Sequence, residues 1–395
     1  MSKLDLISIF CYFCLLGICF YLGNILSFIL PKGFDDEIKN QEFKQITGLR
    51  GFLALSVFLH HAIHSGFVFN YSFDFGPWRL LNSNFFNLIG QLSVALFFSI
   101  TGFLFWRKAI TSGGKINYIQ FIVSRSKRIL PAYLFACLCL LIIIAFQSHA
   151  TLNVSLLDLS KQIFLFITSF GSAQPGVVNN FSHVNIGSGA FWTLRYEWKF
   201  YMLLPLIALF LKNKTAFKVF LFALGAYVVF RIFRNFNLVP HSLFFLPGMI
   251  SAHLYTNKHT HTILKNMNFL PHIFALSLFL IFTTCNSAYS YPCLLFMTLI
   301  FIVIPFIKPS SFIFKILTVR SVLIAGTVSY STYILHSMVL ALGYLGLIRY
   351  DLMSSFSDVY FLFFVFLSSL ALVIISLLSY RYIEYPFIRK IKVRN

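Results

Sequence analysis

The sequence has 395 residues, of which 58% are hydrophobic and only 11% are charged, and its mean hydropathy is +0.82. A soluble globular domain usually has about a quarter of its residues charged, so this chain has too little charge to coat a water-facing surface of its size. The basic residues behind its net charge of +20 lie mostly between apolar runs, which favours membrane orientation over nucleic-acid binding. Composition therefore excludes an ordinary soluble enzyme and indicates an all-α integral membrane protein.

Eleven apolar segments along the chain are candidate membrane spans. A transmembrane helix needs about 20 consecutive, mostly apolar residues. The first segment is too long for the apolar region of a signal peptide, so we count it as a span. We therefore predict about eleven transmembrane helices and no appended soluble domain. In chain order the predicted spans are 5–30, 48–69, 86–106, 128–147, 196–211, 216–233, 241–256, 269–284, 291–307, 322–347 and 358–381.

The distribution of Lys and Arg gives the orientation. If the N-terminus is outside, 23 of the 31 basic residues fall in segments that face the cytosol. Membrane proteins concentrate Lys and Arg on the cytosolic side, so this split predicts an outside N-terminus and a cytoplasmic C-terminus. The same basic segments can contact anionic lipid headgroups or an anionic cytosolic substrate. The predicted cytosolic segments are 31–50, 107–128, 212–218, 257–268, 308–320 and the tail from 381.

Arg50 and His61 are ionisable residues in the span 48–69. They are eleven residues apart, so at 100° per residue they share one helix face and lie about 16 Å apart along the axis. A histidine near the middle of a membrane needs a polar partner or a water-filled cavity. One interpretation is a general base in a cleft with an anion-binding arginine at its cytosolic mouth. The alternative is a snorkelling arginine and a histidine bonded to a neighbouring helix.

A second basic cluster enters the span at 128–147. Arg125 and Arg128 are three residues apart and share a helix face, an arrangement suited to phosphate or pyrophosphate groups. Ordinary positive-inside anchoring would also explain the cluster. Further along, Glu197 is one of only 11 acidic residues and enters an apolar span. It either orients a histidine or holds an acceptor hydroxyl, or it pairs with Arg195, Lys199 or Arg231. The aromatic residues Trp192, Tyr196, Trp198 and Tyr201 around it are predicted to form a belt at the outer interface.

His336 is a second histidine at mid-membrane depth. Hydroxyl side chains precede it in the segment SYSTYILH, which suggests either one shared polar cavity or a histidine bonded to a neighbouring helix. Glu384, in SYRYIEYPF, is predicted to be structural, pairing Arg381 or another basic loop. His60 and His64 have a spacing that can bind metal, but no third ligand accompanies them, so no metal is expected.

Six segments resemble the acyltransferase-3 family of integral membrane O-acyltransferases. They occur in the order of that family, from Gly48 to Phe387, and cover nearly the whole chain after the first predicted span. The segments are TGLRGFLALSVFLHH, ALFFSITGFLFW, RSKRILPAYLFA, WTLRYEWKFYMLLPL, SYSTYILH and RYIEYPF.

The resemblance implies transfer of an acyl group, most often acetyl, from cytosolic acyl-CoA to hydroxyls of cell-envelope glycans such as lipopolysaccharide O-antigen. It also implies a bacterial inner-membrane location. The Arg-x10-His signature of the family falls on Arg50 and His61, and its RxxR signature falls on Arg125 and Arg128. His61 would then be the catalytic base. The other matched positions, Glu197 and His336, would be catalytic, and the three arginines would bind acetyl-CoA, the acyl donor.

Three departures from the family qualify this resemblance. Thr101 stands where the family commonly has Ser, an extra helix precedes the usual first one, and no fused SGNH esterase-like domain is present, which favours direct transfer or a separate periplasmic partner. The predicted organisation is an extra helix at 1–30, a cytoplasmic linker at 31–47, a membrane acyltransferase domain at 48–387 and a basic tail at 388–395. A transporter or exporter of a glycan or small anion is the alternative function.

Overall fold

The computed structural model describes residues 3–64, 84–170, 176–182, 189–234, 239–350, 352 and 358–392. Within these residues the protein is almost entirely helical. One small antiparallel hairpin pairs Val177 with Ser182 and Val178 with Phe181. The end of the second predicted span, at 65–69, and the last residues of the tail, 393–395, lie outside this description.

The helices and strands in chain order are α1 (Lys3–Ile25), η1 (Leu26–Ile29), α2 (Phe34–Lys39), α3 (Lys44–His64), α5 (Asn84–Thr111), α6 (Tyr118–Gln147), α7 (Leu156–Thr168), β1 (Val177–Val178), β2 (Phe181–Ser182), α8 (Trp192–Ala208), η4 (Leu209–Lys212), α9 (Lys214–Arg234), η5 (His241–Phe245), α10 (Leu246–Thr256), α11 (Lys258–Asn266), α12 (Leu270–Thr284), α13 (Tyr291–Val303), η6 (Ile304–Phe306), α14 (Phe312–Leu317), α15 (Arg320–Thr327), α16 (Ser329–Arg349), α17 (Asp358–Ser379), η8 (Tyr380–Glu384) and α18 (Tyr385–Lys392).

Within the described residues every predicted span corresponds to helix, so the all-α membrane fold is confirmed. By length and apolar composition, seven of the described helices could cross a membrane, or eight if α11 and α12, bent by 85° to one another, form one span. The remaining predicted spans are shorter helices, such as α8, α10 and α13. The predicted span 322–347 is divided at Val328 into α15 and α16. Apolar runs thus mark these segments, but several of the helices within them are too short to cross alone.

Helices α3 and α5 form the centre of the bundle. Helix α3 packs against α5, α15 and α16, and α5 packs against α10. The last of these contacts is close because small residues let helix backbones approach each other. A Cβ atom added to Gly248 of α10 would overlap the carbonyl oxygen of Ser99 on α5. Around these contacts the largest side chains of the core, such as Phe58, Phe103 and Phe244, are fully buried.

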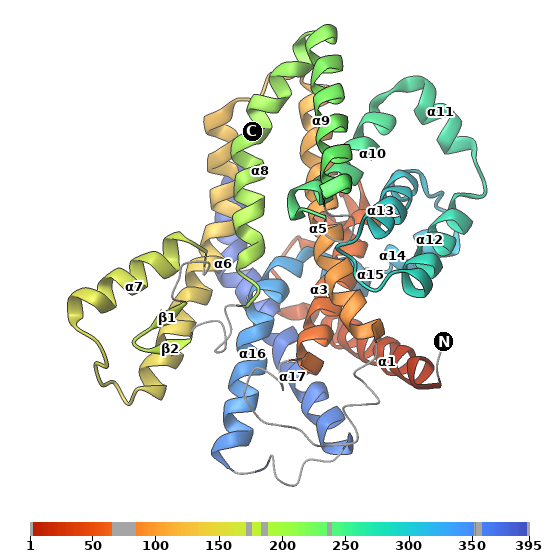
Figure 1. Cartoon of the computed structure of the whole chain (residues 1–395). Helices are drawn as coiled ribbons and strands as arrows, with labels where there is room; N and C mark the ends of the chain where they lie inside the picture. Colours follow the sequence, from red (N-terminus) through yellow and green to blue (C-terminus); the bar gives the residue numbers. More distant parts are fainter. Residues whose placement is uncertain are drawn as a thin grey trace.

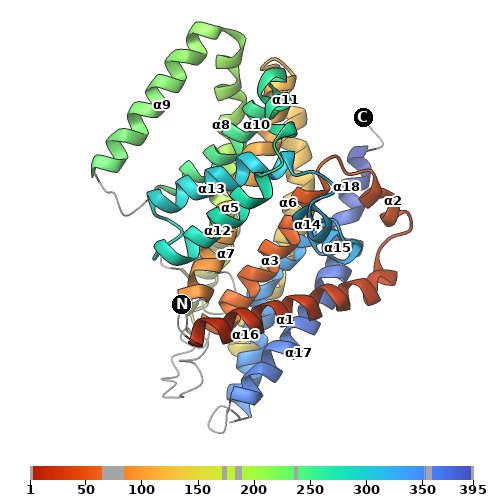
Figure 2. The same cartoon turned by 90° about the vertical axis from the view of Figure 1, so that its right-hand side faces the viewer.

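Other helices lie around this centre (Figures 1 and 2). Helix α1 packs against α15 and α17, and α16 packs against α17. Helix α9 has no buried residue and stands away from the bundle in Figure 2. Because α9 is apolar and long enough to cross a membrane, its exposed side chains suit contact with lipid. In both views the α8–α9 turn, α11 and the C-terminus lie at one end of the molecule, opposite the lower ends of α16 and α17.

Candidate active site

Two glycines hold the first half of α3 tightly against its neighbours. A Cβ atom on Gly48 would overlap the carbonyl oxygen of Leu317, and one on Gly51 would lie 2.8 Å from the backbone nitrogen of Gly326. Gly326 in turn lies against the carbonyl oxygen of Thr47. At 100° per residue, Arg50 points about 160° away from Gly48 and about 100° away from Gly51 around α3. Close packing of α3 on α14 and α15 therefore directs Arg50 away from those helices and toward the cavity.

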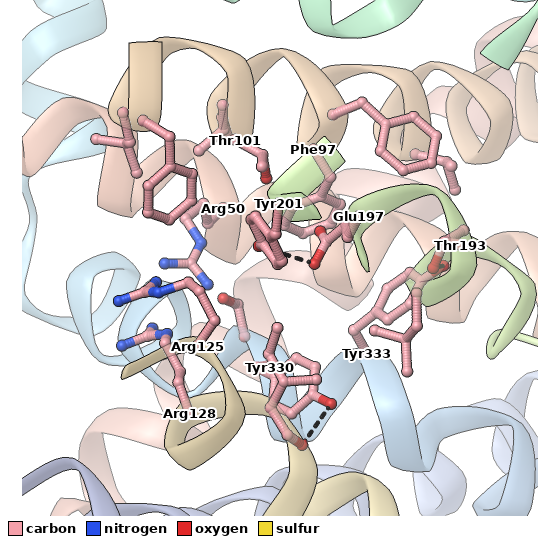
Figure 3. Close-up of a pocket in the computed structure, with 18 residues that line it drawn as sticks. Arg50, Phe97, Thr101, Arg125, Arg128, Thr193, Glu197, Tyr201, Tyr330 and Tyr333 are labelled. Atoms are coloured by element: carbon pink, nitrogen blue, oxygen red, sulfur yellow. Dashed lines mark hydrogen bonds between the residues drawn. The ribbon is translucent and has the colours of Figure 1, made fainter. Parts of the chain in front are cut away.

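A cavity of about 280 Å³ lies on this side of α3 (Figure 3). Side chains from α3, α5, α6, α8 and α16 line it, so segments that are far apart in the sequence meet here. Its polar lining comprises arginine, glutamate, threonine, serine and tyrosine side chains. They are Arg50, Thr101, Arg125, Arg128, Thr193, Glu197, Tyr201, Ser329, Tyr330 and Tyr333.

Three arginines converge at one end of the cavity. Figure 3 shows the guanidinium groups of Arg50, Arg125 and Arg128 side by side. Arg125 also lies over the ring of Phe105, 4.8 Å from its centroid. In the described part of the chain, salt bridges occur at Arg107, Lys161 and Arg320, and none involves the three cavity arginines. Three half-buried positive groups without a carboxylate in ion-pair contact indicate a site for an anion.

Glu197 lines the same cavity. One of its carboxylate oxygens accepts a hydrogen bond of 3.2 Å from the hydroxyl of Tyr201. Its charge is within electrostatic range of Arg50 and Arg125. In Figure 3 Glu197 lies between the arginine end and the end at Thr193 and Tyr333, and its hydrogen-bond contact is to Tyr201.

The opposite end of the cavity is closed by Tyr333 and Thr193. The Tyr333 hydroxyl lies 3.0 Å from the Thr193 hydroxyl and donates a second contact of 3.3 Å to the carbonyl of Ala190. The ring of Tyr333 lies 5.8 Å from the ring of His336, measured between centroids. The wall of the cavity at this end thus adjoins a histidine site.

His61 and His336 form this histidine site. Nδ1 of His61 is 3.1 Å from Nε2 of His336, and the ring centroids are 4.9 Å apart. His336 is fully buried, whereas His61 is half-buried. Helix α3 therefore carries Arg50 at the arginine end of the site and His61 beside the wall at the other end.

The six residues predicted from the sequence occupy two adjoining places. Arg50, Arg125, Arg128 and Glu197 line the cavity, and His61 forms the histidine pair with His336 just beyond its Tyr333 wall. The side chain of His64, considered above as part of a metal pair, lies outside the described residues.

Several residues of the site were not predicted. Thr193 and Tyr201 line the cavity, and Tyr201 is buried, so it is not part of an outer aromatic belt. Its spacing of four residues from Glu197 on one helix was the signal that could have identified it. The prediction for Glu384 also needs correction: it accepts a hydrogen bond from Ser331, whereas Arg381 donates to the carbonyl of Ile29.

Long apolar helices around a cavity lined by arginines and tyrosines, with a histidine pair beside it, define an integral membrane protein with a polar site within its helix bundle. The acyltransferase-3 family model, which describes an acyltransferase domain, matches residues 43–380. The chain belongs to this family and is a membrane acyltransferase. Helix α1 precedes the matched residues. No curated protein and no solved structure gives a significant match to the chain.

Proposed function

We propose that this membrane acyltransferase moves an acetyl group from acyl-CoA to a hydroxyl of a cell-surface carbohydrate such as lipopolysaccharide O-antigen. The observation that carries the proposal is the single cavity with three converging arginines at one end and a wall against the His61–His336 pair at the other. One end suits the phosphates of the donor, and the other places an imidazole beside the expected position of the thioester.

The arginine end fits the donor chemically. Coenzyme A carries a diphosphate and a ribose phosphate, and guanidinium groups bind phosphate oxygens through paired, charge-assisted hydrogen bonds. The cavity of about 280 Å³ is at the lower limit of the usual range for ligand sites, so it would hold part of the donor only. We assign this part to the phosphates nearest the pantetheine arm and to the arm itself.

The distribution of basic segments supports a proposed orientation in the membrane. The α8–α9 turn, α11 and the C-terminus carry predicted cytosolic segments and lie at one end of the molecule in both views. Membrane proteins concentrate basic residues on the cytosolic side. We propose that this end faces the cytosol, with the N-terminus outside, in a bacterial inner membrane. The donor would then enter from the cytosol and the glycan or lipid-linked sugar from the outer side.

In the proposed reaction, an imidazole nitrogen of His61 removes the proton from the acceptor hydroxyl. The oxygen forms a bond to the thioester carbonyl carbon, the carbon–sulfur bond breaks, and the leaving thiolate takes the proton from the imidazolium. The products are an ester and coenzyme A with a free thiol, so atoms and charge balance. A second route through an acyl-imidazole on His61 uses the same nitrogen and gives the same products.

Comparison of the envelope glycan from cells with and without this protein tests the proposal. Mass spectrometry and NMR should show ester-linked acetyl groups that disappear when the protein is absent. An unchanged acylation pattern would contradict the proposal. Uptake of glycan or anion into vesicles that contain the purified protein, without ester formation, would instead support the transporter alternative, which the family match disfavours.

A further inference from the structure

The hydrogen bonds of the histidine pair determine which nitrogen of each ring carries a proton. Hydrogens are assigned from such networks because a neutral imidazole has one donor nitrogen and one acceptor nitrogen. In this pair, the partners at the buried end are backbone carbonyl oxygens, which can only accept. The proton positions can therefore be followed from the buried end outward.

The first step concerns His336. Its Nδ1 lies 2.7 Å from the carbonyl oxygen of Tyr333, in the preceding turn of α16. Two acceptors at this distance would repel each other, so Nδ1 of His336 carries the proton and donates it to that oxygen. In the neutral ring, Nε2 of His336 then holds a lone pair and is an acceptor. This nitrogen is the one that faces His61.

The second step concerns His61. Its Nδ1 faces two acceptors, the carbonyl oxygen of Val57 at 3.0 Å and Nε2 of His336 at 3.1 Å. A single N–H group shared between these two acceptors satisfies both contacts, so Nδ1 of His61 carries the proton. The lone pair of neutral His61 is consequently on Nε2. This is the nitrogen that can take a proton from a hydroxyl or attack a thioester.

We propose that His336 is a positioning residue for His61. Its Nε2 holds His61 in the tautomer whose Nε2 is basic and keeps the ring in place. The same bond favours the charged ring when His61 takes a proton, because a charged donor forms a stronger hydrogen bond to the same acceptor. The tautomer of His61 follows from the hydrogen bonds alone. The role of His336 in catalysis rests on the proposed acyl transfer.

This role differs from that of a histidine that merely fills space. A space-filling ring could be replaced by any side chain of similar volume, whereas a positioning ring requires an acceptor atom at the place of Nε2. Glutamine presents its amide group near the place of Nε2, and the shorter asparagine presents its amide near the place of Nδ1. Phenylalanine fills the space without an acceptor. The three variants His336→Gln, His336→Asn and His336→Phe thus separate acceptor position from volume.

The experiment measures kcat and KM for acetyl-CoA in these purified variants. We expect kcat to fall by about 10- to 100-fold in His336→Phe and His336→Asn, the range seen when a metal-bound histidine loses the partner that orients its ring. His336→Gln should recover a substantial part of kcat. KM for acetyl-CoA should stay close to the wild-type value in all three variants, because His336 is not among the residues that line the cavity.

A matched control is available between the same two helices. The hydroxyl of Tyr344 on α16 donates a buried hydrogen bond of 2.9 Å to the carbonyl of Ala62 on α3. Tyr344→Phe removes this bond and should leave kcat near the wild-type value. A loss of kcat in Tyr344→Phe equal to that in His336→Phe would show that any contact between α3 and α16 has this effect, and would overturn the proposal. Equal kcat in His336→Gln, His336→Asn and His336→Phe would also overturn the proposal. If His336→Phe does not fold, the comparison of His336→Gln with His336→Asn decides.

A second measurement does not depend on acyl transfer. Diethyl pyrocarbonate modifies the lone-pair nitrogen of imidazole, and mass spectrometry of peptides reports the rate at His61. We expect modification of His61 to be slower in His336→Asn and His336→Phe than in the wild type and His336→Gln. Equal rates in all four would contradict the tautomer assignment. If the four proteins show this order of rates but the wild type transfers no acetyl group, the tautomer assignment stands and the proposed function fails.

Discussion

The carboxyl group of Glu384 accepts a hydrogen bond from the hydroxyl of Ser331, which lies 53 positions earlier in the chain. Both side chains are fully buried, and the second carboxyl oxygen of Glu384 has no hydrogen-bond partner among the described residues. Glu384 ends a π-helical turn at Tyr380–Glu384, a local geometry that is frequent at functional sites. The bond joins the last span to α16 and places a carboxyl group within electrostatic range of Arg128 and Arg50.

Removal of the Ser331 hydroxyl should therefore destabilise the protein. Ser331→Ala leaves the buried carboxyl group without this donor, which typically costs about 1–3 kcal/mol of unfolding free energy. The measurement is the thermal midpoint of the purified protein in detergent. Ser160→Ala is the control, because Ser160 is exposed on α7 and donates a hydrogen bond to the Leu157 carbonyl of the same helix. Equal midpoints for wild type and Ser331→Ala would contradict a stabilising role for the Ser331–Glu384 bond.

Loss of Arg128 should weaken donor binding more than catalysis. A hydrogen bond to a charged group is worth about 1.5–3 kcal/mol, so Arg128→Ala should raise KM for acetyl-CoA by about 10- to 100-fold. Arg128→Lys should recover only part of this, because lysine lacks the paired donors of the guanidinium group.

Arg320→Ala is the matched control for charge. Arg320 forms a salt bridge of 3.0 Å with Asp35 and lies outside the cavity. Its replacement removes one positive charge and should leave KM close to the wild-type value. An unchanged KM in Arg128→Ala, or an equal rise in both variants, would contradict donor binding at the cavity arginines.

The wall at Tyr333 should limit the length of the acyl group. Tyr333→Ala would extend the cavity toward the histidine pair, while the backbone carbonyl of residue 333 would remain available to His336. One added methylene in an apolar pocket is worth about 1–3 kcal/mol, so the ratio of kcat/KM for butyryl-CoA to that for acetyl-CoA should rise about tenfold or more.

Thr193→Ala provides the comparison for this prediction. It removes the hydroxyl partner of Tyr333 and keeps the aromatic ring, so the ratio should change much less than in Tyr333→Ala. If neither variant changes the ratio, Tyr333 does not limit acyl length.

The glycine contacts around Arg50 should be intolerant of a methyl group. Gly48→Ala would force α3 away from Leu317, and overpacking of this kind costs typically about 1–3 kcal/mol. We expect less folded protein in the membrane and a lower thermal midpoint. Gly225→Ala is the control, because nothing lies within 4 Å of an added Cβ at that position of α9. A thermal midpoint as high in Gly48→Ala as in Gly225→Ala would show that the α3 contact can relax.

The sequence could predict those features that depend on one helix. Apolar runs located the helical segments, and the helical period placed Arg50 and His61 on one face of α3 and paired Arg125 with Arg128. It could not show that the predicted span 322–347 divides at Val328, because an apolar run continues across the break.

Contacts between distant helices could not be predicted in the same way. His61 bonds His336 across 275 positions, and hydropathy carries no information on which helices are neighbours. Tyr201 illustrates the same point. Its position next to tryptophans suggested an interfacial belt, but packing of α8 against α5 and α6 turns it into the cavity beside Glu197. The residues of the site were thus largely predictable, whereas their division between the cavity and the histidine pair was not.

The central claim is that His61 performs acetyl transfer from acetyl-CoA. The most direct test incubates purified protein in lipid nanodiscs with acetyl-labelled acetyl-CoA and envelope glycan, and follows ester-linked label on the glycan. The wild type and the control His272→Ala, which removes an exposed imidazole, should transfer label. His61→Ala should transfer none at equal abundance and thermal midpoint. Label transfer by His61→Ala at the wild-type rate would contradict the account.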